Sequence, residues 1–361
     1  MEISVETDER RITDIQEENM AVTLAIWVLL GAIGMGLMLY TASNKTIVIM
    51  DNADTHIDRI VEEGGVLTQN KLVFLKNTLA APRTIYIPLE RTVQAEDVVV
   101  ENRYREKELW IYIKGAEASY YEENGISGDI SPIVSGSSES QRGSVILKMQ
   151  MNRVLEYYTT MENGQMTISF KEPHEAYKYL VVIDPMGGGE EMGSILRGYA
   201  EKTLTLQIAN LISEKLQRSD IKLYFTRTKD ESMTKEERIG LVEAVDADLY
   251  IRICAGSRDG DPSVYGISAL YNEEYYIPEL SNVDLADALT RSVTIASGNR
   301  ALGLFAADED SILQDITTTG AQINVGYLTH PTEGELLGQE EYRNKLAQGI
   351  ADAITEVCAD E

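Results

Sequence analysis

The 361-residue chain has few histidines and cysteines, and its basic residues are outnumbered by acidic ones. It contains three histidines (His56, His174 and His330) and two cysteines (Cys254 and Cys358), which excludes a disulfide framework. Lysine and arginine number 32 against 59 aspartates and glutamates, giving a net charge of −27. This balance argues against nucleic-acid binding, which needs a basic face, and against docking on anionic lipid through a polybasic patch.

Near its N-terminus the chain has a long uncharged run that predicts a transmembrane anchor. Residues 21–42 read AVTLAIWVLLGAIGMGLMLYTA, and a helix of that length, at ~1.5 Å per residue, is about 33 Å long and spans a hydrocarbon core of ~30 Å. A buried core helix and a cleaved signal peptide are the alternatives, but a signal peptide usually has a shorter apolar run. Arg10 and Arg11 precede the run and Lys45 follows it. We therefore expect a single-pass cell-membrane protein, with residues 1–20 as a short acidic cytoplasmic tail and the rest outside the cytoplasm.

Residues 45–173 predict a β-rich module, within a chain whose length suggests two domains. Alternating β-branched and aromatic residues are typical of half-buried strands; such runs are TIVIM (46–50), KLVFL (71–75), RTIYIPL (83–89), ELWIYI (108–113), SVILKMQM (144–151) and QMTISF (165–170). Residues 124–143 are rich in Gly and Ser and predict a long loop. The expected fold is a β-sandwich, and its position after the anchor resembles that of AMIN-type modules, which target cell-wall enzymes. We expect His56 and His174 to be structural or exposed.

Residues 178–358 predict an α/β domain with a mostly parallel sheet flanked by helices, because apolar strand-like runs alternate with amphipathic helical ones. The expected strands are YLVVID (179–184), IKLYFTR (221–227), DLYIRI (248–253), GISALY (266–271) and AQINVGYL (321–328). The expected helices are 201–216, one opening on a capping box at 234–237, one capped by Ser281, and a closing helix over 342–357. Ligands of such sheets bind beyond the carboxyl ends of the strands, so we expect a site after residues 183 and 253 and around 324.

The glycine-rich DPMGGG (184–189) is not a phosphate loop, because it matches neither GxGxxG nor the GK[ST] ending. It belongs instead to five ordered blocks: IDPMGGG (183–189), EKTLTLQIANLI (201–212), FTRTKD (225–230), ERIGLVEAVDADLYIRICAG (237–256) and INVGYLTHPTE (323–333). Their order and spacing resemble the zinc-dependent N-acetylmuramoyl-L-alanine amidases, which cleave the bond between glycan and stem peptide in bacterial peptidoglycan. The resemblance covers residues 178–357 and implies the α/β fold of that family and a place outside the cytoplasm.

The resemblance also implies four functional positions, one of which keeps the family's residue. Glu201, in a Glu-Lys pair, matches a zinc-binding glutamate. Gly187 stands where the family's Asp-Pro-Gly-His-Gly-Gly motif has a zinc-binding histidine, and Cys254 stands where it has a second one. Asn324 occupies the position of the catalytic glutamate.

These substitutions remove the chemistry that the resemblance would otherwise imply. Catalytic zinc needs three protein ligands and an open position, and hydrolysis needs a base for the metal-bound water. Glycine offers no donor and the asparagine amide is no base near neutral pH, although a Cys254 thiolate could join Glu201 in a two-ligand remnant. We therefore expect no catalytic residue and no cofactor here, although the family uses zinc.

Structural roles explain the remaining matches equally well. Glu201 is favourable as a carboxylate at a helix start, and Cys254 as a small buried apolar residue. Asp184 begins a turn, and Arg227 and Arg238 are candidate ion-pair formers.

The favoured hypothesis is a membrane-anchored, catalytically inactive pseudoamidase that acts as a binding or regulatory partner in peptidoglycan remodelling. Its partners would be peptidoglycan or cell-wall and division proteins, with no nucleic acid. One alternative is an active amidase with a rebuilt metal site of Glu201, Cys254 and a neighbouring carboxylate such as Glu190 or Glu191. Another is a structural spacer whose interaction surface lies in residues 45–173.

Overall fold

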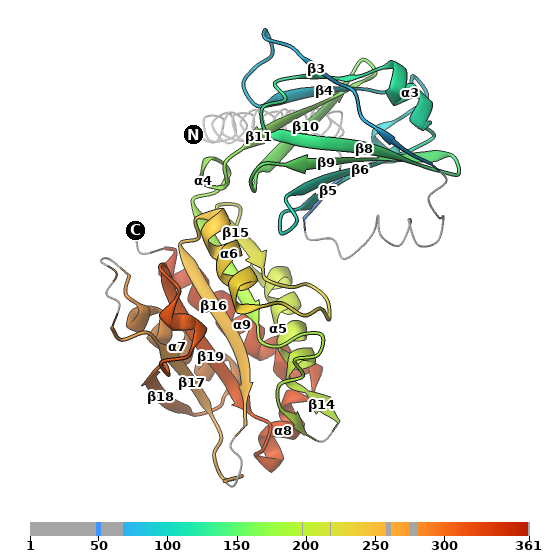
Figure 1. Ribbon diagram of the computed structural model, residues 1–361. Helices are drawn as coiled ribbons and strands as arrows, with labels where there is room; N and C mark the ends of the chain where they lie inside the picture. Colours follow the sequence, from blue (N-terminus) through green and yellow to red (C-terminus); the bar gives the residue numbers. More distant parts are fainter. Residues whose placement is uncertain are drawn as a thin grey trace, which may run out of the picture.

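The computed structural model describes residues 48–51, 68–196, 198–216, 218–257, 261–274, 277 and 280–359. The expected cytoplasmic tail and the expected anchor at residues 21–42 lie outside this part of the chain, as does His56. None of the helices formed by the described residues combines the length and the apolar character needed to cross a membrane. The described residues form two lobes, a β-rich lobe and an α/β lobe (Figure 1).

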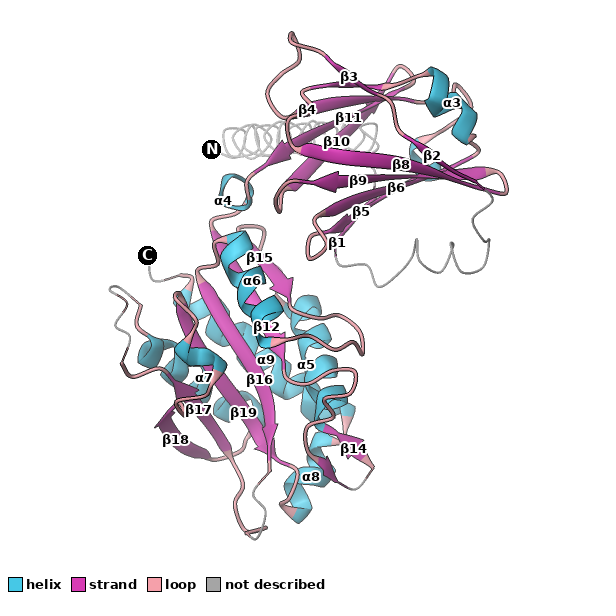
Figure 2. Ribbon diagram, viewed as in Figure 1, coloured by secondary structure: helices cyan, strands magenta, loops and turns pink. Residues whose placement is uncertain are grey.

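The β-rich lobe is a sandwich of two sheets (Figure 2). The first sheet, in spatial order, contains β1 (Val48–Asp51), β5 (Val98–Arg103), β6 (Glu108–Lys114), β9 (Ser144–Met151), β8 (Ile133–Gln141) and β2 (Thr68–Lys71). The second contains β10 (Glu156–Glu162), β11 (Gln165–Lys171), β4 (Thr84–Pro88), β7 (Ile126–Gly128) and β3 (Phe74–Lys76). Short helices η1 (Ala95–Asp97) and α3 (Ala118–Glu123) complete the lobe. Side chains from both sheets, including Ile85, Ile111 and Ile168, form one core, as the alternating strand patterns predict.

The prediction of a long loop over residues 124–143 is wrong, because β7 and β8 lie within it. Strand β8 pairs with β9 along one edge and with β2 along the other, so backbone hydrogen bonds hold it although its side chains are small. Small residues are needed there: a Cβ on Gly136 would lie 2.7 Å from the Phe74 ring. Composition alone therefore gave the wrong secondary structure.

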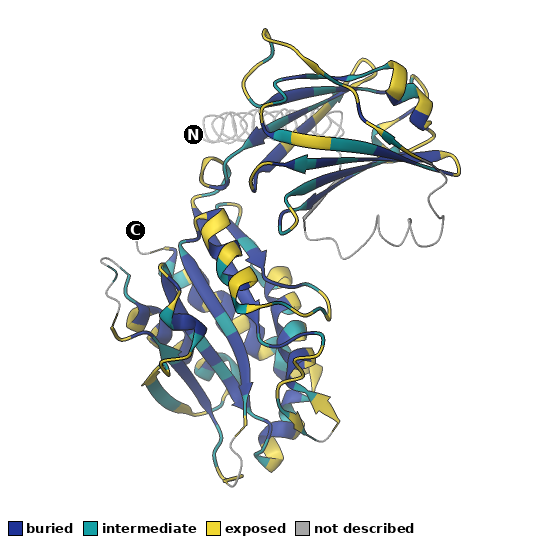
Figure 3. Cartoon of the chain, viewed as in Figure 1, coloured by how far each residue is buried: buried dark blue, intermediate teal, exposed yellow. Residues whose placement is uncertain are grey.

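The α/β lobe has a six-stranded sheet with helices on both faces. Its strands, in spatial order, are β15 (Ile221–Phe225), β12 (Tyr179–Pro185), β16 (Leu249–Gly256), β19 (Thr319–Tyr327), β17 (Ile267–Tyr271) and β18 (Ala301–Ala306). One face carries α5 (Glu201–Lys215), α7 (Asn282–Ser297) and α9 (Glu340–Val357) in a continuous apolar core. The other carries α6 (Lys235–Val245) and η2 (Ile312–Gln314). The buried strands lie between these layers (Figure 3).

The smaller elements of this lobe connect the strands and helices. They are α4 (Pro173–Ala176), the hairpin β13 (Ile195–Leu196) with β14 (Tyr199–Ala200), and α8 (Pro331–Leu337). The helix starts follow the sequence signals: Thr234 and Glu237 form the expected capping box of α6, and the Ser281 hydroxyl accepts from the backbone at the start of α7.

The sheet of this lobe is mixed, which corrects the prediction of a mostly parallel one. Strands β15, β12, β16 and β19 pair in parallel, but β17 runs antiparallel to β19. Residues 257–266 connect β16 to β17, and the described part of this connection, 257 and 261–266, contains no helix. Parallel crossovers need a dozen residues or more, usually including a helix, so this short connection returns the chain in the opposite direction. Strand β18 follows α7 and was not predicted from the sequence.

A buried interface joins the two lobes along β15. The Tyr104 hydroxyl accepts a hydrogen bond from the Phe225 N–H (2.8 Å) and donates one to the Phe225 carbonyl (3.1 Å). The Tyr224 hydroxyl donates to the Glu156 carboxylate at 2.6 Å, and the Lys222 ammonium lies 3.3 Å from the same group. The lobes are thus linked by buried polar contacts as well as by apolar packing.

Candidate functional site

The loop that follows β12 is anchored by Asp184, the last charged residue of that strand. Asp184 is fully buried and accepts hydrogen bonds from Arg238, Arg252, the Tyr250 hydroxyl and the Thr226 hydroxyl. Burial alone would raise the pKa of the Asp184 carboxyl, but the Arg252 and Arg238 guanidinium groups outweigh it and lower the pKa. Asp184 is therefore an ionised structural anchor, and Arg238 is the ion-pair former that its sequence position suggested.

Arg227 holds the same loop in a different way. Its fully buried guanidinium donates to the carbonyls of Pro185 (3.0 Å), Met186 (2.9 Å) and Lys202 (2.7 Å). Arg227 was expected to form an ion pair, but it hydrogen-bonds to these backbone carbonyls instead. These contacts fix the path of the glycine-rich turn against the start of α5.

Gly187, at the first zinc-ligand position, has no room for a side chain. Its φ is +76°, and a Cβ would lie 2.7 Å from the Glu191 carbonyl oxygen and 2.9 Å from Lys202 Cβ. Its own carbonyl accepts a hydrogen bond from Arg238 at 2.9 Å. Left-handed backbone favours glycine, so the turn is shaped for the residue that occupies it and not for a histidine.

Glu201 is the first residue of α5, where a helix-start carboxylate was expected. Its oxygens accept hydrogen bonds from the backbone N–H groups of Ala255 (2.8 Å) and Ser194 (3.1 Å). Burial raises the pKa of the Glu201 carboxyl, and the two N–H groups oppose that rise. The carboxylate thereby ties the end of β16 and the loop before α5 to the helix, in addition to its interaction with the helix dipole.

Cys254 and Asn324 lie opposite each other on β16 and β19. Cys254 is only 3% exposed. Burial raises the pKa of its thiol to about 12, and the opposing effect of the Arg252 charge is smaller. The Asn324 amide donates to the Ser268 hydroxyl at 3.3 Å and accepts from the Gln322 amide at 3.2 Å. A neutral amide at position 324 cannot act as a general base near neutral pH, and the buried Cys254 thiol is protonated in the metal-free protein.

The four positions do not fit a zinc site. The first has no side chain and no space for one, and Asn324 offers a neutral amide in place of a carboxylate. Glu201 already accepts one backbone hydrogen bond on each carboxylate oxygen. Within the residues that the structure describes, no cluster of three or more His, Cys, Asp or Glu side chains is arranged to hold a metal ion. The prediction that the chain uses no zinc stays a prediction, since it concerns the protein in solution.

The other candidate ligands have different surroundings. Glu190 and Glu191 are exposed on the turn, and the Glu191 carboxylate lies 4.0 Å from Arg238. His330 is the N-cap of α8, and its Nδ1 accepts from the Glu333 N–H at 3.2 Å. His174 Nε2 lies 2.8 Å from the Asp246 carbonyl oxygen, which agrees with a structural role.

Sequence reasoning missed Arg252, which lies between Asp184 and Gln322 on adjacent strands. The signal was available: an arginine inside the apolar run DLYIRI must be buried with a partner, because unpaired charges are rarely buried. Its side chain is 13% exposed and reaches Asp184 at 2.9 Å.

Comparisons with known proteins agree with the residues that suggested the family. Residues 181–356 match the family model described as N-acetylmuramoyl-L-alanine amidase. The chain is 27% identical over 191 residues to the germination-specific N-acetylmuramoyl-L-alanine amidase of Bacillus subtilis, covering 48% of this chain and 78% of the relative. It is 26% identical over 172 residues to the amidase LytC of the same organism, covering 48% and 34%. A crystal structure of an N-acetylmuramoyl-L-alanine amidase from Clostridium difficile is 25% identical, covers 51% of this chain and 98% of that one, and has a TM-score of 0.48.

Proposed function

Because residues 181–356 belong to the N-acetylmuramoyl-L-alanine amidase family, we propose that this chain is a membrane-anchored cell-wall protein that binds peptidoglycan, or a partner at the wall, without hydrolysing it. Membership of this family supports a role of the chain at the cell wall. The anchor rests on the uncharged run at residues 21–42, which predicts a single-pass arrangement with both lobes outside the cytoplasm. The β-rich lobe, resembling targeting modules in its position, would hold the α/β lobe near the membrane.

One observation carries the inactive assignment: the turn at Gly187 excludes a ligand side chain. A single substitution elsewhere could be offset by a neighbouring residue, but a left-handed glycine packed against Lys202 and Glu191 leaves the metal without its first protein ligand. The two backbone donors on Glu201 and the amide at Asn324 support the same reading. The fold is kept while the groups that would activate water are missing.

The test measures binding and hydrolysis in one preparation. The full chain, purified in detergent, is incubated with purified peptidoglycan and Zn²⁺, with an active amidase of the family as positive control. We expect the chain to sediment with the peptidoglycan and to release no stem peptide detectable by mass spectrometry. Release of stem peptide that stops on addition of a chelator would overturn the proposal and favour the rebuilt metal site.

A further inference from the structure

The two edges of the α/β sheet differ in what covers them. At one edge, the Tyr104 hydroxyl of the β-rich lobe hydrogen-bonds to the N–H and the carbonyl of Phe225 on β15. At the other edge, β18 pairs with β17, and no described residue pairs with its outer side (Figure 1). Proteins usually protect an edge with charged residues, proline or a covering segment, because an open edge pairs readily with another strand. The sequence of β18, ALGLFA, contains neither a charge nor a proline.

The register of β18 determines which of its backbone groups face outward. The Ala307 N–H donates to the Tyr271 carbonyl at 2.9 Å, and Tyr271 is opposite Ala306. Since every second residue of a parallel strand bonds to the neighbouring strand, the N–H and C=O of Phe305 face β17. The N–H and C=O groups of Leu304 and Ala306 therefore point away from β17, and no described residue bonds to them.

Charge at the two ends of β18 favours a partner strand that runs in the opposite direction. Arg300, just before the strand, is exposed; it stacks on the Tyr265 ring at 3.8 Å, and no carboxylate of the described residues lies within 4.0 Å of it. Just after the strand, three exposed carboxylates have no described Lys or Arg within 4.0 Å: Asp308, Glu309 and Asp310. An antiparallel second copy would place its basic start beside this acidic end, and the reverse, so the charges of the two copies are complementary.

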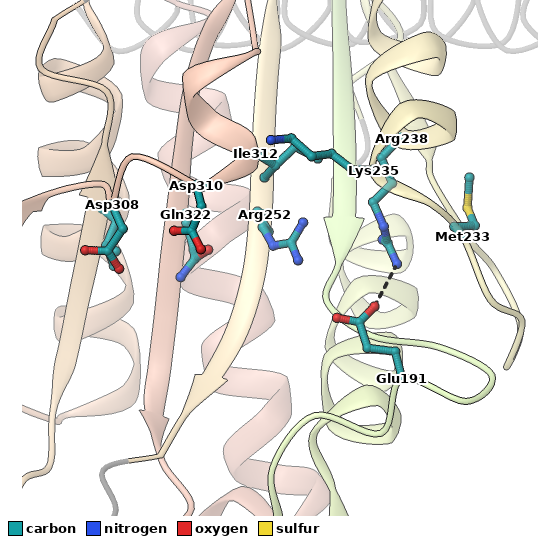
Figure 4. Close-up of a pocket in the computed structure, with 11 residues that line it drawn as sticks. Glu191, Met233, Lys235, Arg238, Arg252, Asp308, Asp310, Ile312 and Gln322 are labelled. Carbon is teal, nitrogen blue, oxygen red and sulfur yellow. Dashed lines mark ion pairs between the residues drawn. The ribbon is translucent and has the colours of Figure 1, made fainter.

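The acidic end of β18 is not neutralised from within the chain. Asp308 and Asp310 line a cavity over Arg252, and Figure 4 shows Asp308 on the opposite side of this cavity from Arg238. The basic side chains of the cavity, Lys235, Arg238 and Arg252, already pair with other carboxylates of the same chain. The carboxylates after β18 are therefore available to a positive group of another molecule.

We propose that two copies of this chain pair edge to edge through β18, antiparallel and about a twofold axis at Phe305. Leu304 of each copy would exchange both of its outward backbone hydrogen bonds with Ala306 of the other. Phe305, which is 50% exposed, would lie opposite Phe305 of the second copy, at the non-hydrogen-bonded position where cross-strand side chains are closest. Pairing would stop at two copies, because the β-rich lobe covers the other edge at β15. The inference goes beyond the proposed function and does not depend on whether the chain binds or hydrolyses peptidoglycan.

Oxidative cross-linking of the full chain tests the register of this pairing. At a non-hydrogen-bonded position the two Cα atoms are about 4.5 Å apart, which a disulfide can span, so we expect Phe305→Cys to form a disulfide-linked dimer. Both native cysteines are buried. Ala301→Cys, at an exposed position of the same strand, is the matched control: in this register its two copies lie eight residues apart, about 27 Å at ~3.4 Å per residue, and should not cross-link. Equal cross-linking of the two variants, or none in Phe305→Cys, would overturn the proposed register.

Sedimentation velocity of the full chain in density-matched detergent measures the assembly without a cross-link. We expect a dimer at about 100 μM chain, where a complex with a micromolar Kd is nearly fully formed. Phe305→Lys places like charges opposite each other on the edge strand and should sediment as a monomer. Leu79→Lys, at a position that is 94% exposed in the β-rich lobe, should remain a dimer. A monomeric wild type, or a dimer that Phe305→Lys leaves intact, would overturn the inference, and the assays of peptidoglycan binding and hydrolysis would be unaffected by either result.

Discussion

Substitution of Gly187 by alanine tests whether the first ligand position can hold any side chain. The left-handed backbone should cost about 1–2 kcal/mol in any L-residue. The Cβ would also press on the Glu191 carbonyl oxygen at 2.7 Å and on Lys202 Cβ at 2.9 Å, and such overpacking typically costs about 1–3 kcal/mol. We therefore expect Gly187→Ala to lower the free energy of unfolding by about 2–5 kcal/mol, the sum of these two effects.

Gly298, which ends α7, is the matched control. Its φ is +69°, close to that of Gly187, but a Cβ there meets nothing within 4 Å. Gly298→Ala should therefore lose only the backbone contribution of about 1–2 kcal/mol. Urea unfolding of both full-length variants, followed by circular dichroism, measures the difference. Equal losses in the two variants would show that position 187 has space for a side chain, and the structural case against a ligand there would fail.

Three further predictions concern buried groups. Cys254 and Cys358 are both buried, so neither should react with a thiol reagent in the native protein at about pH 8, where exposed thiols react readily. Both should react in denaturant. Fast labelling of Cys254 in the native protein would contradict its burial. Tyr104→Phe should lower the free energy of unfolding by about 1–3 kcal/mol, because it leaves the Phe225 N–H and carbonyl at the lobe interface without their partner; an unchanged urea midpoint would contradict that role. Asp184→Asn should cost about 3–5 kcal/mol at pH 7 by breaking a buried charge network. Since the folded pKa of Asp184 is lowered, its stabilisation is present above the unfolded pKa of about 3.9 and is lost as pH falls. The difference between wild type and Asp184→Asn should therefore shrink below about pH 4, and a difference that is constant from pH 7 to 3 would refute the assignment.

Local signals in the sequence predicted the elements of the α/β lobe well. The capping box at Thr234 and the cap at Ser281 start α6 and α7 as expected, because each satisfies backbone N–H groups within a single helical turn. The direction of β17 could not be predicted this way, since it depends on how a short connection crosses the sheet. Strand β8 was missed because its stability comes from ladder hydrogen bonds to two neighbours and not from its own side chains.

The sequence motifs located the residues of the candidate site, but they did not predict which groups surround each residue. Matching motifs located Gly187, Glu201, Cys254 and Asn324, and their chemistry indicated a missing metal site. The motifs could not show that the turn at Gly187 is closed to any side chain, or that both oxygens of Glu201 accept backbone hydrogen bonds. These facts depend on residues far apart in the sequence. The cavity over Arg252 was missed for the same reason, because residues from three strands and three other segments line it.

Zinc content of the full chain tests the central claim most directly. The wild type and Glu201→Gln, which keeps a carbonyl oxygen for the Ala255 N–H, are dialysed against Zn²⁺ and analysed for bound metal. We expect both proteins to retain the same amount, well below one zinc per chain, because the retained glutamate is a structural acceptor and not a ligand. One zinc bound per wild-type chain and lost in Glu201→Gln would contradict the account.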